Sequence, residues 1–345
     1  MISQSKKRIY WIDIAKAIAI LCIVFGHTLR GGIAQIIVYS FHVPTFFLLS
    51  GMTFREKTFK EQIKSDFLRI LVPYFSFGII SILIFFFLGK FAASQLQLDV
   101  DISLGNNLWG LIYANPSVQD MKFNMPLWFL PCLFITKTVF NLLCKLLRKK
   151  EMLVFGCVII AAVSFVYSSL NGPDLPFNIS VALKMLMFFS LGRIFVLNIS
   201  TIENCFNKAH KALFAGIALL AIASVVACFN SKIGYYIDDF NNITLFLITS
   251  VTGSFGVCFF SMGIGRCRVL EYVGKKTLSI LVMHKFPVLL FQTVGPQKNI
   301  LMQYDTMLGI VASLVVAVIA IIMCLIADWI INKIAPFLLG DFFTY

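Results

Sequence analysis

Long apolar runs alternate with short polar breaks along the whole chain. Each run holds about 20 residues, the length that a helix needs to cross a hydrocarbon core about 30 Å thick. The pattern predicts spans at roughly 9–29, 33–54, 70–91, 126–144, 152–170, 179–198, 212–230, 242–263, 277–295 and 306–331. We therefore expect an all-α, polytopic integral membrane protein with about ten transmembrane helices in one bundle, and residues 1–345 as a single domain.

Composition and charge agree with a membrane protein. The chain is 59% hydrophobic and 13% charged, whereas a soluble domain carries about a quarter charged residues. Its net charge is +13, but the basic residues are dispersed among loops, which argues against nucleic acid as a partner and favours membrane lipids. Nine cysteines are scattered singly without a CxxC pair, which is typical of buried apolar side chains rather than of disulfides or a metal site.

The loop charges predict an orientation. Basic residues gather in alternate loops, at 55–69, 145–150, 208–211 and 266–276, and Lys6, Lys7 and Arg8 precede the first span. By the positive-inside rule these segments are cytoplasmic, so with an even number of spans both termini are expected in the cytoplasm of a cell (plasma or inner) membrane protein. The first apolar run is long and lacks a small-residue cleavage site, which favours an uncleaved helix over a signal peptide.

The longest segment outside the predicted spans runs from about residue 92 to 125. Long loops of this kind are usually functional or disordered. Trp109 and Tyr113 within it would equally suit the headgroup region of a bilayer, so a simple interfacial anchor is the alternative.

The first span, "IDIAKAIAILCIVFGHT" from Ile12 to Thr28, contains three ionisable side chains. Lys16 and His27 are eleven residues apart, about 20° past three full turns, so they project from one helix face about 16 Å apart. Ionisable groups inside a span usually face a polar cavity. Alternatively, Lys16 extends to the cytoplasmic surface or pairs with Asp13, and His27 is merely interfacial.

His42 follows in "SFHVPTFFLLSG", on the antiparallel second span at a depth near that of His27. Two imidazoles at similar depth predict a polar pocket in the outer half of the membrane. The alternative is that His42 only bonds to backbone loosened by Pro44.

His284 lies in the ninth predicted span, with Ser279 and Lys285 nearby, and is either part of the pocket or a satisfied interior group. His210, between basic loop residues, is expected to be solvated. The intramembrane histidines fall on separate helices without i, i+4 pairing, so we expect no metal site. A neutral imidazole in a partly dry pocket suits a general base.

Five segments resemble the membrane acyltransferase type 3 family, in order along nearly the whole chain. The first consists of Lys16, ten further residues and His27, and many members have arginine in place of this lysine. Asp66, just before the third span, stands where many members have a second arginine. The others are "FHVPTFFLLSG" (41–51), "LRILVPYF" (68–75), "PLWFLPCLF" (126–134) and "LEYVGKKTLSILVMH" (270–284). The second-span segment is similar to the sugar O-acetyltransferase branch, the fucose 4-O-acetylase-like proteins.

The resemblance implies an O-acyltransferase that moves an acyl group, usually acetyl from acetyl-CoA, to a hydroxyl of a carbohydrate, lipid-linked glycan or cell-surface polysaccharide. Acyl-CoA is then a substrate, and no bound cofactor is expected. The resemblance makes His27 and His42 catalytic candidates, places Lys16 and Arg69 against the anionic donor, and gives supporting roles to Asp13, Trp128, Ser279 and His284. His27 would remove the proton of the acceptor hydroxyl or briefly carry the acyl group.

A glycan or lipid transporter or flippase is the main alternative function, because it would use the same histidines and lysine. The chain shows no internal repeat and no corresponding pair of Gly/Pro-broken helices, which many transporters have. A non-catalytic scaffold would leave Lys16 and His27 on one face unexplained.

Overall fold

The computed structural model of the chain describes residues 8–96, 103–116, 122–206, 208–293, 297–301 and 303–342. Within these ranges the chain forms helices and no β-strand, apart from an isolated bridge between Gly234 and Asp239. The α-helices are α1 (Tyr10–Thr28), α2 (Gly32–Met52), α3 (Phe59–Asp66), α4 (Val72–Leu96), α5 (Leu104–Tyr113), α6 (Phe129–Leu146), α7 (Lys150–Ser169), α8 (Ile179–Leu197), α9 (Ile199–Cys205), α10 (Ala209–Ala227), α11 (Ile243–Ile264), α12 (Arg268–Lys275), α13 (Thr277–Met283), α14 (Lys285–Thr293), α15 (Gln297–Leu301) and α16 (Met307–Ile334). Short π or 3-10 segments are η1 (Phe67–Leu71), η2 (Lys122–Trp128), η3 (Pro176–Asn178), η4 (Tyr235–Ile237) and η5 (Pro336–Leu339).

Nine helical segments in the described part of the chain are long and apolar enough to cross a membrane. They correspond to nine of the predicted spans and confirm an all-α, polytopic membrane protein. The prediction for 277–295 differs from the structure, where this segment forms α13 and α14 with a break at His284. Pro287 explains the break, because proline has no N–H for the carbonyl of Met283 and its ring clashes with that carbonyl in a continuous helix.

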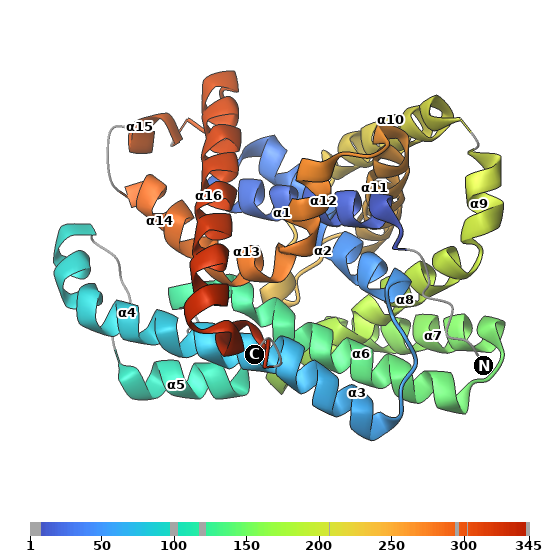
Figure 1. The fold of residues 1–345 in the computed structure, drawn as a ribbon, viewed down its shortest axis with the longest axis horizontal. Helices are drawn as coiled ribbons and strands as arrows, with labels where there is room; N and C mark the ends of the chain where they lie inside the picture. The colour runs from blue at the N-terminus through green and yellow to red at the C-terminus, as the bar shows by residue number, and fades with distance from the viewer. Residues whose placement is uncertain are drawn as a thin grey trace.

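Helix α2 lies in the middle of the bundle, where it packs against α1, α8 and α11 (Figure 1). Its crossing with α8 is very close. A Cβ atom at Gly51 would lie 1.9 Å from the carbonyl oxygen of Phe189, and one at Gly192 would lie 1.9 Å from that of Leu48. Small residues let membrane helices approach in this way. The crossing therefore fixes the position of α2, which carries His42.

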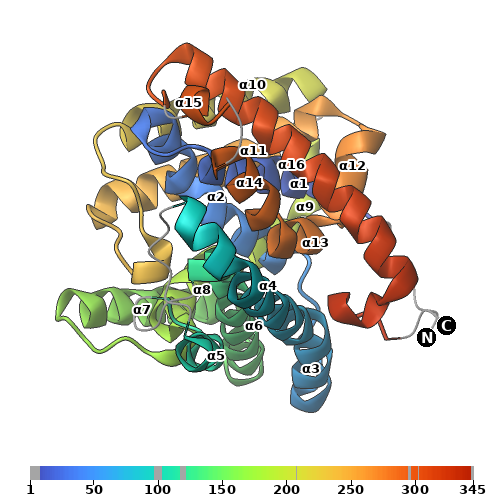
Figure 2. The same cartoon turned by 90° about the vertical axis from the view of Figure 1, so that its left-hand side faces the viewer.

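The outer helices turn apolar side chains outward, as lipid contact requires. Phe155 of α7, Phe214 of α10 and Met307 of α16 are among the most exposed. Helix α16 runs across α1, α13 and α14 (Figure 2). Its exposed apolar face is therefore backed by the helices that carry His27 and His284.

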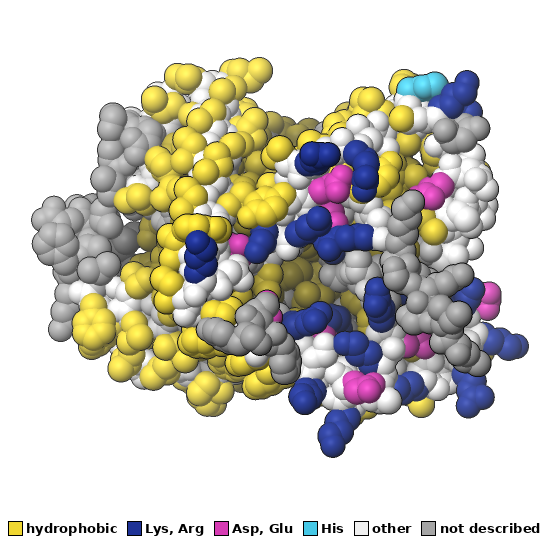
Figure 3. Space-filling model, viewed as in Figure 1, with side chains coloured by type: hydrophobic (Ala, Val, Ile, Leu, Met, Phe, Trp, Pro, Cys, Tyr) yellow, Lys and Arg dark blue, Asp and Glu magenta, His cyan; other side chains and the backbone are white. Residues whose placement is uncertain are grey.

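One face of the molecule is basic. Lys and Arg side chains gather over α3 and α12, whereas apolar side chains cover α16 (Figure 3). The guanidinium carbon of Arg266, just before α12, lies 5.5 Å from the centroid of the Tyr10 ring. Gly340 packs against the backbone of Leu68, just after α3. Both ends of the described chain therefore lie near the basic face.

The segment 92–125 is partly helical. Helix α4 continues to Leu96 and α5 follows, while residues 97–102 and 117–121, like Lys6 and Lys7, lie outside the described ranges. The rings of Trp109 and Tyr113 lie 6.1 Å apart, and the Tyr113 hydroxyl donates to the carbonyl oxygen of Asp174 at 2.7 Å. These aromatic residues thus connect α5 to the segment before η3.

Candidate active site

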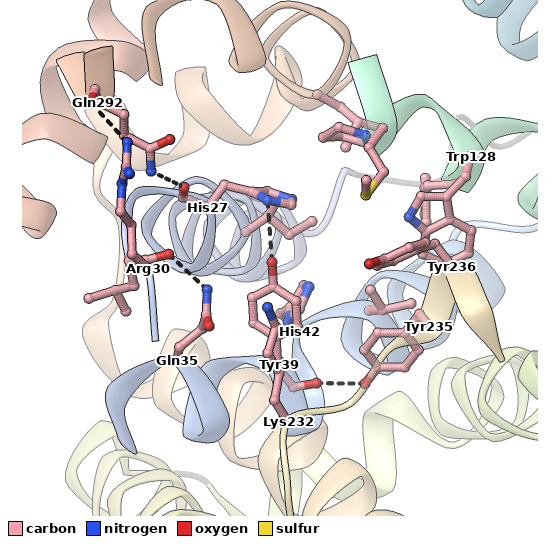
Figure 4. Close-up of a pocket in the computed structure, with 17 residues that line it drawn as sticks. His27, Arg30, Gln35, Tyr39, His42, Trp128, Lys232, Tyr235, Tyr236 and Gln292 are labelled. Carbon is pink, nitrogen blue, oxygen red and sulfur yellow. Dashed lines mark hydrogen bonds between the residues drawn. The ribbon is translucent and has the colours of Figure 1, made fainter. Parts of the chain in front are cut away.

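A cavity of about 460 Å³ lies between the C-terminal end of α1, the N-terminal half of α2 and the segment that joins α10 to α11. His27, Tyr39 and His42 approach it from α1 and α2, and Trp128 and Tyr235 stand across from them (Figure 4). The lining also includes Arg30, Gln35, Lys232, Tyr236, Leu281 and Gln292. Three residues singled out from the sequence, the two histidines and Trp128, therefore line one cavity.

His27 is held in the last turn of α1 by two glutamines. The last carbonyls of a helix lack backbone donors and need other partners. The side-chain amide of Gln292 donates to the carbonyl oxygens of His27 and Thr28 at 2.9 and 3.1 Å. The amide of Gln35 donates to the carbonyl oxygen of Gly26 at 2.9 Å. The end of α1 is thereby fastened to α2 and α14, which fixes the backbone of His27.

Tyr39 lies between the two histidines. Its hydroxyl oxygen is 3.3 Å from Nδ1 of His27, and its ring centroid is 4.8 Å from that of His42. A tyrosine hydroxyl both donates and accepts, so it fits either tautomer of His27. When His27 Nδ1–H donates to Tyr39, the Nε2 lone pair is left to accept a proton.

Hydrogen bonding fixes the tautomer of His42. Its Nδ1 lies 2.6 Å from the carbonyl oxygen of Val38, which only accepts, so the hydrogen is on Nδ1 and the lone pair is on Nε2. Pro44 deprives a different carbonyl, that of Ser40, of its helical donor, and the Ser250 hydroxyl donates to this oxygen at 2.8 Å. His42 therefore keeps a basic nitrogen, and Ser250 of α11 satisfies the carbonyl that Pro44 frees.

His284 lies beside His27 at the break between α13 and α14. The two ring centroids are 5.2 Å apart. Its Nδ1–H donates to the carbonyl oxygen of Leu281 at 2.9 Å, whereas its buried Nε2 has no hydrogen-bond partner among the described residues. Bonds to the backbone of α13 thus account for only one of its two ring nitrogens.

The wall opposite the histidines is aromatic. The rings of Trp128 and Tyr235 are nearly parallel, with centroids 6.4 Å apart, and the Tyr235 hydroxyl donates to the carbonyl oxygen of Tyr39 at 2.8 Å. Tyr235 belongs to the α10–α11 segment, which is anchored by Asp238. The carboxylate of Asp238 accepts from Nζ of Lys184, a fully buried lysine of α8, at 2.6 Å. The position of this wall therefore depends on an ion pair with the helical bundle.

A second cavity, of about 760 Å³, lies beyond the other end of α2. Its charged lining residues are Lys57, Glu61, Lys64, Arg69 and Asp341. Arg69 belongs to the π turn η1, which precedes Pro73. Because Pro73 has no N–H for the Arg69 carbonyl, a regular α-helical turn cannot continue here. The proline of the third-span segment thus accounts for the local geometry of Arg69.

Helix α13 contributes to both cavities. Leu278 lines the second cavity and Leu281 lines the first. Residues three apart lie on one side of a helix, separated by about 4.5 Å along its axis. Helix α13 therefore lines both cavities, with its two lining residues less than one turn apart.

Several candidate residues lie outside both cavities. Asp13 accepts two hydrogen bonds from Arg8, at 2.6 and 3.0 Å, which raise the pKa of the Arg8 guanidinium. Lys16 lines neither cavity and forms no ion pair within the described ranges. The Ser279 hydroxyl donates to Asp328 at 2.6 Å. Ser279 therefore joins α13 to α16. The alternative in which Asp13 pairs with Lys16 differs from the structure, where Asp13 pairs with Arg8.

Asp66 also lines neither cavity. It is buried, pairs with the ammonium of Lys137 on α6, and accepts from the amide of Gln62. The carboxylate at this position therefore joins α3 to α6.

Some cavity residues gave no distinct sequence signal. Tyr39 stands in an apolar stretch that is typical of core aromatics, and Tyr235 lies in a short loop between two predicted spans. Gln35 and Gln292 act on carbonyls of α1 through tertiary contacts that spacing does not reveal. Lys184 did carry a signal, because a charged residue within the span 179–198 needs a partner.

The chemistry available in the first cavity is that of imidazole bases beside aromatic and amide groups. A neutral imidazole can accept a proton through its free ring nitrogen. Within the described ranges, no three His, Cys, Asp or Glu side chains are grouped so as to hold a metal ion. The arrangement is therefore suited to proton transfer at a bound hydroxyl group.

Comparison with known proteins supplies the family. The family model of acyltransferase 3, described as an acyltransferase domain, matches residues 9–329. No curated protein and no solved structure was found to match. The matched range includes His27, His42, Arg69, Trp128 and His284. The chain therefore belongs to the acyltransferase 3 family and is a membrane acyltransferase.

Proposed function

We propose that the protein transfers an acyl group, in the simplest case acetyl, from acyl-CoA to a hydroxyl of a carbohydrate or lipid-linked glycan, as its resemblance to the fucose 4-O-acetylase-like branch implies. The observation that carries the proposal is a pair of cavities that are both lined by α13. One contains two histidines and an aromatic wall, and the other contains three cations. A two-substrate transfer needs such a pair of sites.

The second cavity is the proposed donor site. Arg69, Lys57 and Lys64 supply positive charge for the phosphates of CoA, and guanidinium groups bind phosphate oxygens in pairs. The carboxylate of Glu61 is occupied in capping α3, where it accepts from the backbone and hydroxyl of Thr58 at 3.1 and 2.8 Å. The pantetheine arm then follows α13 from Leu278 to Leu281 and brings the thioester to the histidines.

The first cavity is the proposed acceptor site, with His27 as general base. The Nε2 lone pair of His27 takes the proton of the acceptor hydroxyl while the hydroxyl oxygen attacks the thioester carbon. A C–O bond forms, the C–S bond breaks, and the CoA thiolate takes the proton from the imidazolium.

His42 and Tyr39 support this chemistry in the proposal. Tyr39 orients the ring of His27 through Nδ1, and His42 accepts a hydrogen bond from the acceptor through Nε2. Trp128 and Tyr235 offer flat surfaces against which a sugar ring can lie.

The orientation in the membrane follows from the charges. The basic face that carries α3 and α12 is the proposed cytoplasmic face, which puts both termini and the donor site in the cytoplasm. The histidine cavity then opens toward the outside of a plasma or inner membrane, where surface polysaccharide is available for modification.

The proposal is tested by replacing His27 with glutamine, which keeps hydrogen bonding but cannot accept the proton. A positioned general base contributes about 10²–10⁴-fold to rate. We expect His27→Gln to lower acetyl transfer by that factor, measured as thiol release from acetyl-CoA by purified protein given extracted surface glycan. Mass spectrometry of the glycan should show the loss of an acetyl ester.

His210→Gln is the matched control, because His210 is exposed and remote from both cavities, and it should keep normal transfer. Near-normal transfer by His27→Gln would remove His27 as the base. Glycan movement across the membrane without thiol release in the unaltered protein would support the transporter alternative instead.

A further inference from the structure

Two cations stand at the rim of the histidine cavity. Arg30 follows the end of α1, and Lys232 belongs to the α10–α11 segment. Both residues are exposed overall, and both line the cavity. In Figure 4 they come from two sides of the cavity that also holds His27 and His42.

No carboxylate lines this cavity within the described ranges. The two acidic residues of the α10–α11 segment are engaged elsewhere. Asp238 binds Lys184, and the carboxylate of Asp239 accepts from the backbone N–H of Asn241 at 3.0 Å. Neither forms an ion pair with a rim cation. The cavity therefore carries positive charge without an anionic counterpart.

The rim cations keep unused hydrogen-bonding capacity. One nitrogen of Arg30 donates to the carbonyl oxygen of Gln292 at 2.8 Å, which leaves other N–H groups of its five. The ammonium of Lys232 lies 4.8 Å from the centroid of the Tyr39 ring and has no oxygen partner among the described residues. Partial burial lowers the pKa of this ammonium, as expected for a cation without an anionic partner.

From this imbalance we infer that the acceptor of the acyl group is anionic and carries a carboxylate or phosphate that binds Arg30 and Lys232. The inference rests on the proposed function. The anionic group would lie at the rim, the sugar ring against Trp128 and Tyr235, and the reacting hydroxyl at His27. A guanidinium binds carboxylate or phosphate in a paired geometry, so the rim would also fix which hydroxyl reaches the base.

A phospholipid headgroup offers the same anionic chemistry as a substrate. Cations near the surface of a membrane attract anionic lipids. The experiment therefore needs one arm in neutral lipid and one in anionic lipid.

The test compares two probes that differ only at C6, p-nitrophenyl glucuronide and p-nitrophenyl glucoside. Their binding is measured by equilibrium dialysis with full-length protein in phosphatidylcholine nanodiscs. We expect the glucuronide to bind about tenfold more tightly, as two partly exposed charge contacts would give. The Arg30→Gln/Lys232→Gln double variant should bind both probes within about twofold of each other. Lys211→Gln, at the remote start of α10, should keep the preference.

Equal binding of the two probes, or no measurable binding of either, would overturn the inference. Loss of the preference when phosphatidylglycerol replaces part of the phosphatidylcholine would also overturn it, because lipid would then be the anion at the rim. Failure of the proposed function would appear separately, as absent thiol release from acetyl-CoA by unaltered protein.

Discussion

Replacing Lys184 with methionine should loosen the aromatic wall of the histidine cavity. Nζ of Lys184 donates to both oxygens of Asp238 at 2.6 and 2.7 Å and to the Ser168 hydroxyl at 2.6 Å. The same ammonium lies 5.3 and 5.4 Å from the ring centroids of Phe165 and Phe240. Methionine keeps the apolar stem and removes the charge, so the Asp238 carboxylate loses its cation and keeps only the Ser168 hydroxyl, at 2.5 Å, as a side-chain donor among the described residues.

The magnitude follows from burial. Removing one member of a buried ion pair costs about 3–5 kcal/mol, because the remaining charge stays desolvated. The Lys184 side chain is 0% exposed and that of Asp238 is 13% exposed, so water reaches the remaining carboxylate to some extent. We therefore expect the lower end, about 3 kcal/mol, which corresponds to about a hundredfold shift toward a detached α10–α11 segment.

We would measure two quantities: the hydrogen-exchange rate of residues 228–242 and the KM for the acceptor. Lys184→Met should raise both, while the KM for acetyl-CoA stays unchanged because Lys184 does not line the donor cavity. Adding Asp238→Asn should reverse at least half of the increase in hydrogen exchange and in the KM for the acceptor. Asparagine tolerates the positive φ at this position and carries no charge. The control is the ion pair of Arg266 and Glu271, which are 3.8 Å apart with side chains 75% and 16% exposed. Because the guanidinium of Arg266 is in water, Arg266→Met should have little effect. Unchanged exchange in Lys184→Met, or a double variant no better than the single one, would refute this account.

Three further predictions concern other parts of the molecule. Arg69→Ala should raise the KM for acetyl-CoA by about tenfold or more, whereas Lys16→Ala, outside both cavities, should raise it less. The reverse order in a steady-state assay would assign phosphate binding to Lys16 instead of Arg69. A single cysteine placed at Asn171 should react with a membrane-impermeant maleimide added outside cells and one at Lys149 should not, and the opposite labelling would reverse the proposed orientation. Gly192→Ala should lower the thermal unfolding temperature and the transfer rate, because its Cβ would lie 1.9 Å from the Leu48 carbonyl oxygen. Gly105→Ala is the control, since a Cβ there has no atom within 4 Å, and equal stability of the two variants would contradict the close crossing.

The lengths of the apolar runs were sufficient to place most of the membrane-spanning helices. The expected spans 9–29 and 306–331 correspond to Tyr10–Thr28 and Met307–Ile334 within a few residues. The prediction of one span at 277–295 was wrong because the apolar run continues through Pro287, whereas the helical hydrogen bonding of the backbone does not. The proline was visible in the sequence, and its missing N–H and the ring clash were the signal for two short helices.

The candidate site was predictable where helix geometry alone decides depth. His27 and His42 were expected at similar depth on antiparallel helices, and they line one cavity. Gln35, Gln292 and Tyr235 were not predictable as cavity residues, because the apolar pattern does not encode their side-chain hydrogen bonds to the backbone of α1 and α2. The spacing of Lys16 and His27 fixes the side of α1 from which Lys16 projects. It does not fix which neighbouring helix packs against that side.

The presence of one helix in the lining of both cavities also bears on ion permeability. A continuous water path from the basic cavity to the histidine cavity would let protons cross the membrane and dissipate the gradient across it. Between the cavities α13 presents Leu278 and Leu281, about 4.5 Å apart along the axis. Apolar constrictions block ions because water leaves them. In the proposed reaction cycle, the pantetheine arm occupies this constriction during transfer, and the two leucines seal it when the donor leaves. The apolar side chains of α13 would thus form part of the electrical barrier across the membrane.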